Sequence, residues 1–297
     1  MALHRLTLSL TAPLGTPLTG PTLFGRLCWL FREAEGEAAL EAWLGDPARM
    51  WRLSDAFPAG CLPRPIGRPR PLGPDQLKRL KEVKNRPMLL RDTWLARRDA
   101  WDEAAVDPDR DLRADAAMSW RTAHNTIDRR TGTTPEVGGL YFVAEDWRFV
   151  QAESRMLDLY VEADDSSDRI RWAFEELGRE GYGRDASTGR GRWRVVDACE
   201  DPALMAGSGD RRMSLSRGFL TPETMADAFW RLEPLFGKAG PQLTASGVSP
   251  FKKPVLLTRP GTTFYPVGDG LWGRWMTGVH PERPEIGVNG LHLAIPF

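Results

Sequence analysis

The chain has 297 residues, and its 40 basic and 40 acidic side chains cancel, which excludes a uniformly basic coat that binds any polyanion. Apolar residues make up 41% and charged residues 27%, ordinary values for a globular protein that exclude wholesale disorder. No apolar run approaches the roughly 18–20 residues of a membrane span, and the start lacks a signal-peptide pattern. We therefore expect a cytoplasmic protein with no membrane partner.

The first elements alternate between strand and helix patterns. His4–Leu10 alternates apolar and polar side chains, which predicts a strand. Pro21 stands at the expected first position of a helix, whose apolar residues continue at helical spacing to about Leu44. A second strand is expected over Met50–Phe57. Six prolines follow between Pro58 and Pro74, which predicts an extended surface segment; Leu62–Pro74 is a candidate contact for a partner protein or an exposed linker.

Regular patterns return after a charged, weakly periodic insertion over residues 75–135. The segments 140–150 and 155–163 are expected to be the two strands of a hairpin. A helix is predicted to begin at Ser166–Ser167 and to end at Gly178, and a glycine-rich loop then leads to a strand over 192–199. The order of these elements is βαββαβ, which is the ferredoxin-like or RRM-like plan.

We predict an α+β protein with two ferredoxin-like (RRM-like) domains. The first domain covers residues 1–204 and carries the βαββαβ order, a long insertion at about 58–137 and the glycine-rich loop. The second, smaller domain covers residues 205–297. It is expected to contain a strand over Met213–Leu220 and then a helix that begins at Thr221–Pro222.

The charges are unevenly distributed along the chain. Residues 64–98 contain eleven Lys/Arg and three Asp/Glu, whereas residues 99–115 contain seven acids and two bases. Blocks of opposite sign suggest separate binding faces, one for a polyanion and one for a basic partner. Two solvated faces that limit aggregation are an equally good explanation.

The glycine-rich loop EGYGRDASTGRGRW is the sharpest local signal. Its glycines permit close backbone approach, and its arginines supply cations beside exposed amides, which suits a phosphodiester backbone. The loop is not a Walker loop, because no Lys-Ser/Thr follows its last glycine. An ordinary connection rich in glycine is the alternative. The candidate RNA-binding residues here are Gly183, Arg184, Ser187, Thr188, Gly189, Arg190 and Arg192.

Two further segments carry weaker signals. The sequence AHNTIDRRTGTT offers donors suited to phosphate, ribose or base edges, and its candidates are His124, Asn125, Arg129, Arg130 and Thr131. Taken alone, this segment is explained better by a polar turn. The helix N-terminus that follows Gly20 offers free amides for a phosphate, with Arg26 nearby.

Signals for catalysis are weak. The four histidines have no metal-ligand spacing, and the three cysteines form no CxxC pair. The sequence has no GxSxG or HExxH motif. We therefore expect no catalytic residue, no metal and no cofactor.

The glycine-rich loop resembles that of the RAMP superfamily, the RRM-like proteins of CRISPR effector complexes. Within it, four segments together resemble the family of type III-A Csm-complex subunit four, a member of the Cas five group. They are TPLTGPTLFGRLCW, SDAFPAGCLPRP, HNTIDRRTGT and SPFKKPVLLTRPGT, which come in the family's order.

The resemblance implies a non-catalytic subunit that binds the repeat-derived 5′ handle of crRNA. It implies two protein partners, the large polymerase-domain subunit (Cas ten) and the backbone RAMP subunit (Csm subunit three). By position, Gly183–Arg192 would support the handle and His124–Thr131 would lie near the guide. Lys252 and Lys253 would be a basic contact of the second domain.

Two other functions stay open at this point. One is a RAMP endoribonuclease that cleaves precursor crRNA with His4, or target RNA with Asp55 or Asp128. The other is a free-standing RRM-like protein that acts on cellular RNA.

Overall fold

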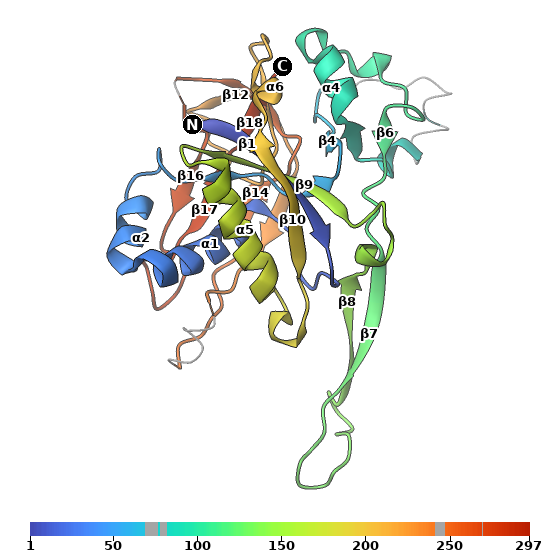
Figure 1. The fold of residues 1–297 in the computed structure, drawn as a ribbon, viewed down its shortest axis with the longest axis vertical. Coiled ribbons are helices and arrows are strands. Elements are labelled where there is room, and N and C mark those ends of the chain that lie inside the picture. The colour runs from blue at the N-terminus through green and yellow to red at the C-terminus, as the bar shows by residue number, and fades with distance from the viewer. Residues whose placement is uncertain (69–76, 78–81, 241–246, 269) are drawn as a thin grey trace.

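The computed structural model describes residues 1–68, 77, 82–240, 247–268 and 270–297 (Figure 1). Its main sheet is antiparallel and has the order β10-β1-β9-β2, with β3 also paired to β9. The strands are β1 (Ala2–Leu10), β2 (Arg52–Leu53), β3 (Phe57–Pro58), β9 (Met156–Ala163) and β10 (Trp193–Glu200). With α1 (Gly20–Glu35) before β2 and α5 (Ser167–Glu180) before β10, this part of the chain follows the predicted βαββαβ order.

Both long helices pack on one face of this sheet. The alternation of β1 places Leu6 and Leu8 in the same core as Phe24 of α1 and Phe174 of α5. The helix predicted to run to Leu44 is instead divided into α1 and α2 (Glu37–Leu44). The division falls at Gly36, whose φ of 92° no helix accommodates.

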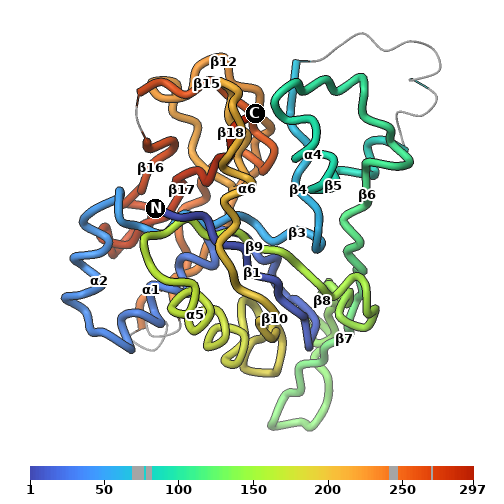
Figure 2. Tube along the Cα trace, turned by 45° about the horizontal axis from the view of Figure 1, so that its top comes forward, coloured from blue at the N-terminus to red at the C-terminus, as the bar shows by residue number. Residues whose placement is uncertain are grey.

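The predicted insertion forms a small sheet and a long hairpin. The small sheet contains β4 (Cys61–Pro63), β5 (Met88–Leu90) and β6 (Leu112–Arg113), and α4 (Arg91–Arg97) follows β5. The hairpin contains β7 (Ser119–Asn125) and β8 (Leu140–Asp146) and projects from the body of the molecule (Figures 1 and 2).

The predicted pairing of 140–150 with 155–163 is wrong. β8 pairs with β7 over its whole length, and β9 pairs instead with β1. The sequence pattern does not predict β7. The side chains of this strand are all exposed or half-buried, so apolar and polar residues do not alternate along it.

The proline-rich segment does not begin as an exposed surface segment. Cys61–Pro63 forms the edge strand β4, and all three of its residues are buried. Farther along, the Ile66 amide donates to Gly261 O at 2.7 Å. Residues 69–74 lie outside the described residues, so a partner contact over Leu62–Pro74 stays a prediction.

The two charge blocks face each other rather than forming separate binding faces. Arg64 pairs with Glu103, Arg86 with Asp109 at 2.8 Å, and Arg97 with Asp111 at 3.7 Å. In each pair the base comes from the basic block and the acid from the acidic block. The opposite signs therefore neutralise each other within the insertion, and the expectation of separate faces is wrong at these positions.

The C-terminal part consists mainly of antiparallel strands. One sheet has the order β12-β15-β11-β18, and two pairs of strands, β13 with β14 and β16 with β17, complete it. The bounds are α6 (Pro202–Met205), β11 (Arg212–Ser214), β12 (Met225–Phe229), β13 (Leu232–Leu235), β14 (Val255–Thr258), β15 (Thr263–Pro266), β16 (Gly273–Met276), β17 (Val288–Leu291) and β18 (Ala294–Pro296). The described residues after position 205 form no helix.

The helix predicted after Thr221–Pro222 is therefore wrong. A bulge interrupts the pairing of β12 with β15 between Ala226 and Phe229. The one extra residue places Phe229 four positions after Met225, so a bulged strand imitates helical spacing.

One core joins the two predicted domains. Leu3 and Tyr160 of the main sheet pack in the same apolar cluster as Met213 and Ile295 of the C-terminal sheet. The boundary at residue 204 and the ferredoxin-like character of residues 205–297 stay predictions. In the described part of the chain, no helix has the length and apolarity to cross a membrane.

Candidate nucleic-acid interface

The glycine-rich loop packs against the segment that connects β1 to α1. The Gly191 amide donates to Pro13 O at 2.8 Å, and the Arg184 amide donates to Thr16 Oγ1 at 2.9 Å. The buried Tyr182 hydroxyl donates to Pro17 O at 2.9 Å. The loop is thus fixed to the body of the molecule at three points.

The glycines of this loop have different roles. A Cβ on Gly191 (φ 67°) would lie 2.1 Å from Tyr182 O, and one on Gly183 (φ 74°) would lie 2.5 Å from the Thr16 side chain. A Cβ on Gly189 (φ 93°) would meet no described atom within 4 Å. Gly183 and Gly191 are therefore needed for packing, whereas the space beside Gly189 is open.

The arginines of the loop are largely engaged with the protein itself. Arg190 Nε donates to Glu145 Oε1 at 2.8 Å, and Arg184 Nη2 donates to Ala144 O at 2.6 Å. Arg192 Nη1 donates to Arg179 O at 2.9 Å. Two of the three predicted phosphate ligands thus hold the root of the β7–β8 hairpin. Ser187 and Thr188 are exposed in a short 3₁₀ turn beside them.

The second predicted segment forms the outer end of this hairpin. His124 stacks on Tyr141 with ring centres 5.3 Å apart, and Asn125 Nδ2 donates to Thr134 Oγ1 at 2.8 Å. Arg129, Arg130 and Thr131 are exposed in the turn beyond β7. The glycine-rich loop therefore lies at the root of one hairpin, and the segment His124–Thr131 lies at the outer end of the same hairpin.

The hairpin also exposes aromatic side chains that the sequence analysis did not select. Trp120 is 56% exposed, Tyr141 48% and Phe142 54%. The Arg121 guanidinium lies 5.1 Å from the centre of the Phe142 ring. The available signal was a run of aromatic residues without alternation in a charged segment, which marks an exposed strand rather than a core strand.

Glu145 is the polar centre of the hairpin root. Its buried carboxylate accepts hydrogen bonds from Arg190, from Thr122 Oγ1 at 2.7 Å and from Trp147 Nε1 at 3.1 Å. Burial alone would raise the pKa of Glu145, but these three donors together hold the pKa below its ordinary value. Glu145 is therefore an ionised, fully hydrogen-bonded anchor.

The helix N-terminus at Gly20 is already occupied. Asp55 Oδ1 accepts the Gly20 N–H at 3.0 Å, and Asp55 also pairs with Arg217 at 3.1 Å. A Cβ on Gly20 would lie 2.3 Å from Leu53 O. A carboxylate of the chain thus takes the position expected for a phosphate, and the phosphate prediction at Gly20 is wrong. Arg26 pairs with Glu180 at 3.0 Å, directly before the glycine-rich loop.

The two lysines of the C-terminal part differ from each other. Lys252 Nζ donates to Gly287 O at 2.8 Å, and burial lowers the pKa of Lys252. Lys253 is exposed. Lys252 is thus a packed residue beside Cys28 of α1, and Lys253 alone is placed as a surface cation.

Comparisons with known proteins identify the fold. No protein-family model and no curated protein matches the chain. Over 99% of its length, the chain matches 97% of a chain in the Csm1-Csm4 cassette in complex with cA4, with a TM-score of 0.61 and 13% identity. All of it matches 99% of a chain in the Csm3-Csm4 subcomplex of the type III-A CRISPR-Cas interference complex, with a TM-score of 0.60 and 11% identity. The chain has the Csm4 fold.

The three residues named for a ribonuclease, His4, Asp55 and Asp128, each make contacts within this Csm4-like chain. His4 is buried, with Nδ1 3.0 Å from Ser167 Oγ, and burial lowers the pKa of His4. Asp55 is buried at the start of α1. Asp128 closes the hairpin turn by accepting the Arg130 amide at 2.9 Å. No group of three or more His, Cys, Asp or Glu among the described residues is arranged to hold a metal ion.

The Csm4-like chain also lacks the base-stacking platform of an RRM sheet. The sheet face opposite the helices carries Arg5 and Thr7 of β1 beside Asp158 and Tyr160 of β9. Tyr160 and, opposite Asp158, Phe57 of β3 are aromatic residues of this face, and both are buried. RRM proteins stack bases on exposed aromatic residues of their sheet, so this face does not support a free-standing RRM.

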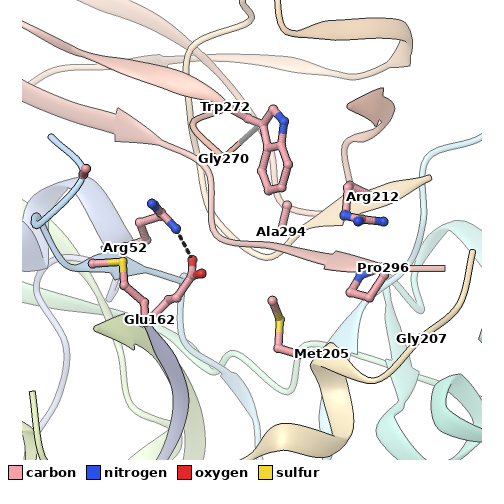
Figure 3. Close-up of a pocket in the computed structure, with 11 residues that line it drawn as sticks. Arg52, Glu162, Met205, Gly207, Arg212, Gly270, Trp272, Ala294 and Pro296 are labelled. Carbon is pink, nitrogen blue, oxygen red and sulfur yellow. Dashed lines mark hydrogen bonds and ion pairs between the residues drawn. The ribbon is translucent and has the colours of Figure 1, made fainter. Parts of the chain in front are cut away.

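The clefts lie away from the hairpin and the glycine-rich loop. One cleft of about 360 Å³ lies between the edge of the main sheet and the C-terminal sheet (Figure 3). Trp272 points into it on one side, and Arg52 pairs with Glu162 at 2.7 Å on the other. Its lining includes no residue predicted to bind RNA.

Proposed function

We propose that this chain is a non-catalytic, cytoplasmic subunit of a type III-A CRISPR-Cas (Csm) interference complex that binds the repeat-derived 5′ handle of crRNA. The observation that carries the proposal is the projecting β7–β8 hairpin, which combines exposed aromatic and cationic side chains and is rooted on the glycine-rich loop. The Csm4 fold over the whole chain supports the assignment to this complex.

The chemistry of the hairpin suits single-stranded RNA. Exposed rings such as Trp120 and Phe142 offer faces on which unpaired bases stack, at about 1–3 kcal/mol per base. Arg121, Arg129 and Arg130 supply cations for phosphates within the same element. Binding of this kind needs no catalytic residue, which agrees with the buried positions of His4 and Asp55.

Two protein partners belong to the same proposal. Matching chains occur in complexes with Csm1 and with Csm3, so we expect the large polymerase-domain subunit (Cas ten) and the backbone RAMP subunit to contact this chain. The outer face of β13 and β14 suits a protein contact, because Leu232 is 50% and Leu256 59% exposed and Phe236 beside them is 75% exposed. We also propose that residues 205–297 are a reduced second ferredoxin-like domain, which their four-stranded antiparallel sheet supports.

The test is binding of labelled repeat-handle RNA by the wild-type chain and by Trp120→Ala and Phe142→Ala. We expect each variant to weaken binding about tenfold, with the fold unchanged by circular dichroism. Phe236→Ala, at a more exposed aromatic residue outside the hairpin, is the matched control and should bind RNA as the wild type does.

Two results would contradict the proposal. Equal RNA affinity of all three variants would remove the hairpin from the RNA site. Cleavage of precursor or target RNA by the purified chain, abolished by Asp128→Ala, would favour the endoribonuclease instead.

A further inference from the structure

The orientation of the β7–β8 hairpin depends on its root. Within these two strands, all of whose residues are described, Glu145 alone is buried. The outer residues have the body of the molecule on neither face, so they contribute little to holding the hairpin at a fixed angle. Seven residue pairs at about 3.4 Å per residue make an arm of roughly 20 Å, and a tilt of about 15° at the root would move its end by about 5 Å.

Three contacts fix this root. Glu145 accepts from Arg190 of the glycine-rich loop, and Ala144 O accepts from Arg184 of the same loop. Leu14 and Asp146 exchange two backbone hydrogen bonds of 3.0 Å. Of these contacts, the Glu145–Arg190 pair joins two side chains, with the carboxylate side chain fully inaccessible and the guanidinium 24% exposed.

Neither member of the pair is free to act on RNA in the way that its position in the sequence suggests. Arg190 Nε is directed at Glu145, and the Glu145 carboxylate has three donors. A carboxylate at the base of an RNA-binding element repels phosphate, so its presence there needs another explanation. The geometry provides one, because Glu145 links the loop, β7 through Thr122, and the segment after β8 through Trp147.

We propose that Glu145 and Arg190 are a positioning pair that sets the angle of the hairpin on the glycine-rich loop, so that Arg190 supports RNA binding through the hairpin and not by contacting phosphate. The inference rests on the proposed function for its RNA readout. The positioning itself is a property of the protein alone and has its own measurement.

The decisive variant is Glu145→Gln, because electrostatic repulsion and positioning predict opposite changes in RNA affinity. Removal of a negative charge near RNA should strengthen binding if electrostatics alone mattered. Loss of the positioning pair should weaken binding, and we expect a loss of about tenfold. Glu162→Gln is the matched control, since it removes the carboxylate of another half-buried Arg–Glu pair, in the cleft of Figure 3, and should leave RNA affinity unchanged.

A double-mutant cycle with Arg190→Ala tests whether the two residues act together. We expect the double variant to bind RNA about as weakly as each single variant, and the salt dependence of Arg190→Ala to match that of the wild type. Additive losses, or a log–log salt slope lowered by about 0.7 in Arg190→Ala, would show a direct phosphate contact and overturn the proposal. If Glu145→Gln does not fold, Thr122→Val removes one donor to the same carboxylate and replaces it.

A distance measurement separates this inference from the proposed function. Spin labels attached through unnatural amino acids at Val137 in the hairpin turn, which is 91% exposed, and at Glu41 on α2 report the position of the hairpin without RNA. We expect Arg190→Ala and Glu145→Gln to broaden or shift the distance distribution by about 5 Å. An unchanged distribution overturns the positioning pair even if RNA binds, whereas a shifted distribution in a chain that does not bind RNA contradicts only the proposed function.

Discussion

The carboxylate of Asp55 at the start of α1 gives this protein an unusual dependence of stability on pH. Burial raises the pKa of Asp55 from 3.8 to about 6, even though Gly20 and Arg217 favour its ionised form. The folded state therefore binds a proton that the unfolded state has released. The resulting stabilisation is full below pH 3.8 and is lost as the pH rises through 6, and a shift of about two pKa units corresponds to about 3 kcal/mol.

His292 opposes this effect within the same pH range. Burial of the ring lowers the pKa of His292 from 6.5 to about 4, although the hydrogen bond to Phe219 O at 3.1 Å acts in the opposite direction. Its stabilisation is full above pH 6.5 and is lost as the pH falls through 4, again by about 3 kcal/mol. Between pH 4 and pH 6 the stabilisation from Asp55 falls with rising pH about as steeply as the stabilisation from His292 rises, so the two changes nearly cancel.

Asp55→Asn should leave the pH dependence that His292 gives to the stability without its opposing contribution. We expect the free energy of unfolding of this variant, relative to the wild type, to fall by about 3 kcal/mol as the pH is lowered from 6.5 to 4. His292→Gln should show the opposite trend over the same range. Urea unfolding at half-unit pH steps measures both differences, and the wild type serves as the reference that removes every other titrating group. Parallel curves for Asp55→Asn and the wild type would refute the assignment of a raised pKa to this carboxyl.

The other predictions concern the loop and the hairpin. Gly191→Ala should lower the free energy of unfolding by more than 2 kcal/mol, because the new Cβ would overlap Tyr182 O. Gly189→Ala should lower it by only about 1 kcal/mol, because there the positive φ is the sole source of strain, and thermal unfolding measures both losses. Arg130→Ala should lower the log–log salt slope of RNA binding by about 0.7, measured by fluorescence anisotropy, and an unchanged slope would remove Arg130 from the phosphate contacts. Trp230→Ala, at another exposed aromatic residue outside the hairpin, should leave RNA affinity unchanged.

The part of the fold that the sequence predicts correctly is the part that buries one face of each element. Leu6 and Leu8 alternate in β1 and Ile170 and Phe174 recur in α5, since each element has one apolar side against a common core. The hairpin was missed for the opposite reason, because both of its faces meet solvent. The sequence of β12 predicts a helix, because the bulge of this strand breaks the period of two.

The sequence singles out two of the segments that form the candidate site, but not the contacts between them. Gly183–Arg192 and His124–Thr131 do lie on one continuous structure. The assignment of Arg184 and Arg190 to phosphate failed to foresee their protein partners, because Ala144 and Glu145 lie about forty residues earlier in the chain. A sequence shows which side chains are cations, whereas their partners depend on contacts that only the folded chain makes.

The long sequence separation between β1 and its partner strands β9 and β10 has a consequence for the biosynthesis of the protein. β1 needs β9 and β10 as neighbours, so its edges stay unpaired until about residue 200 has been made. At about 5–20 residues per second, synthesis of that length takes roughly 10–40 s. For most of this interval Leu6 and Leu8 lack the cover that Phe174 of α5 supplies in the folded chain, and such distant contacts also slow folding after release. Cells that contain more holdase chaperone should therefore yield a larger fraction of the chain in its native form.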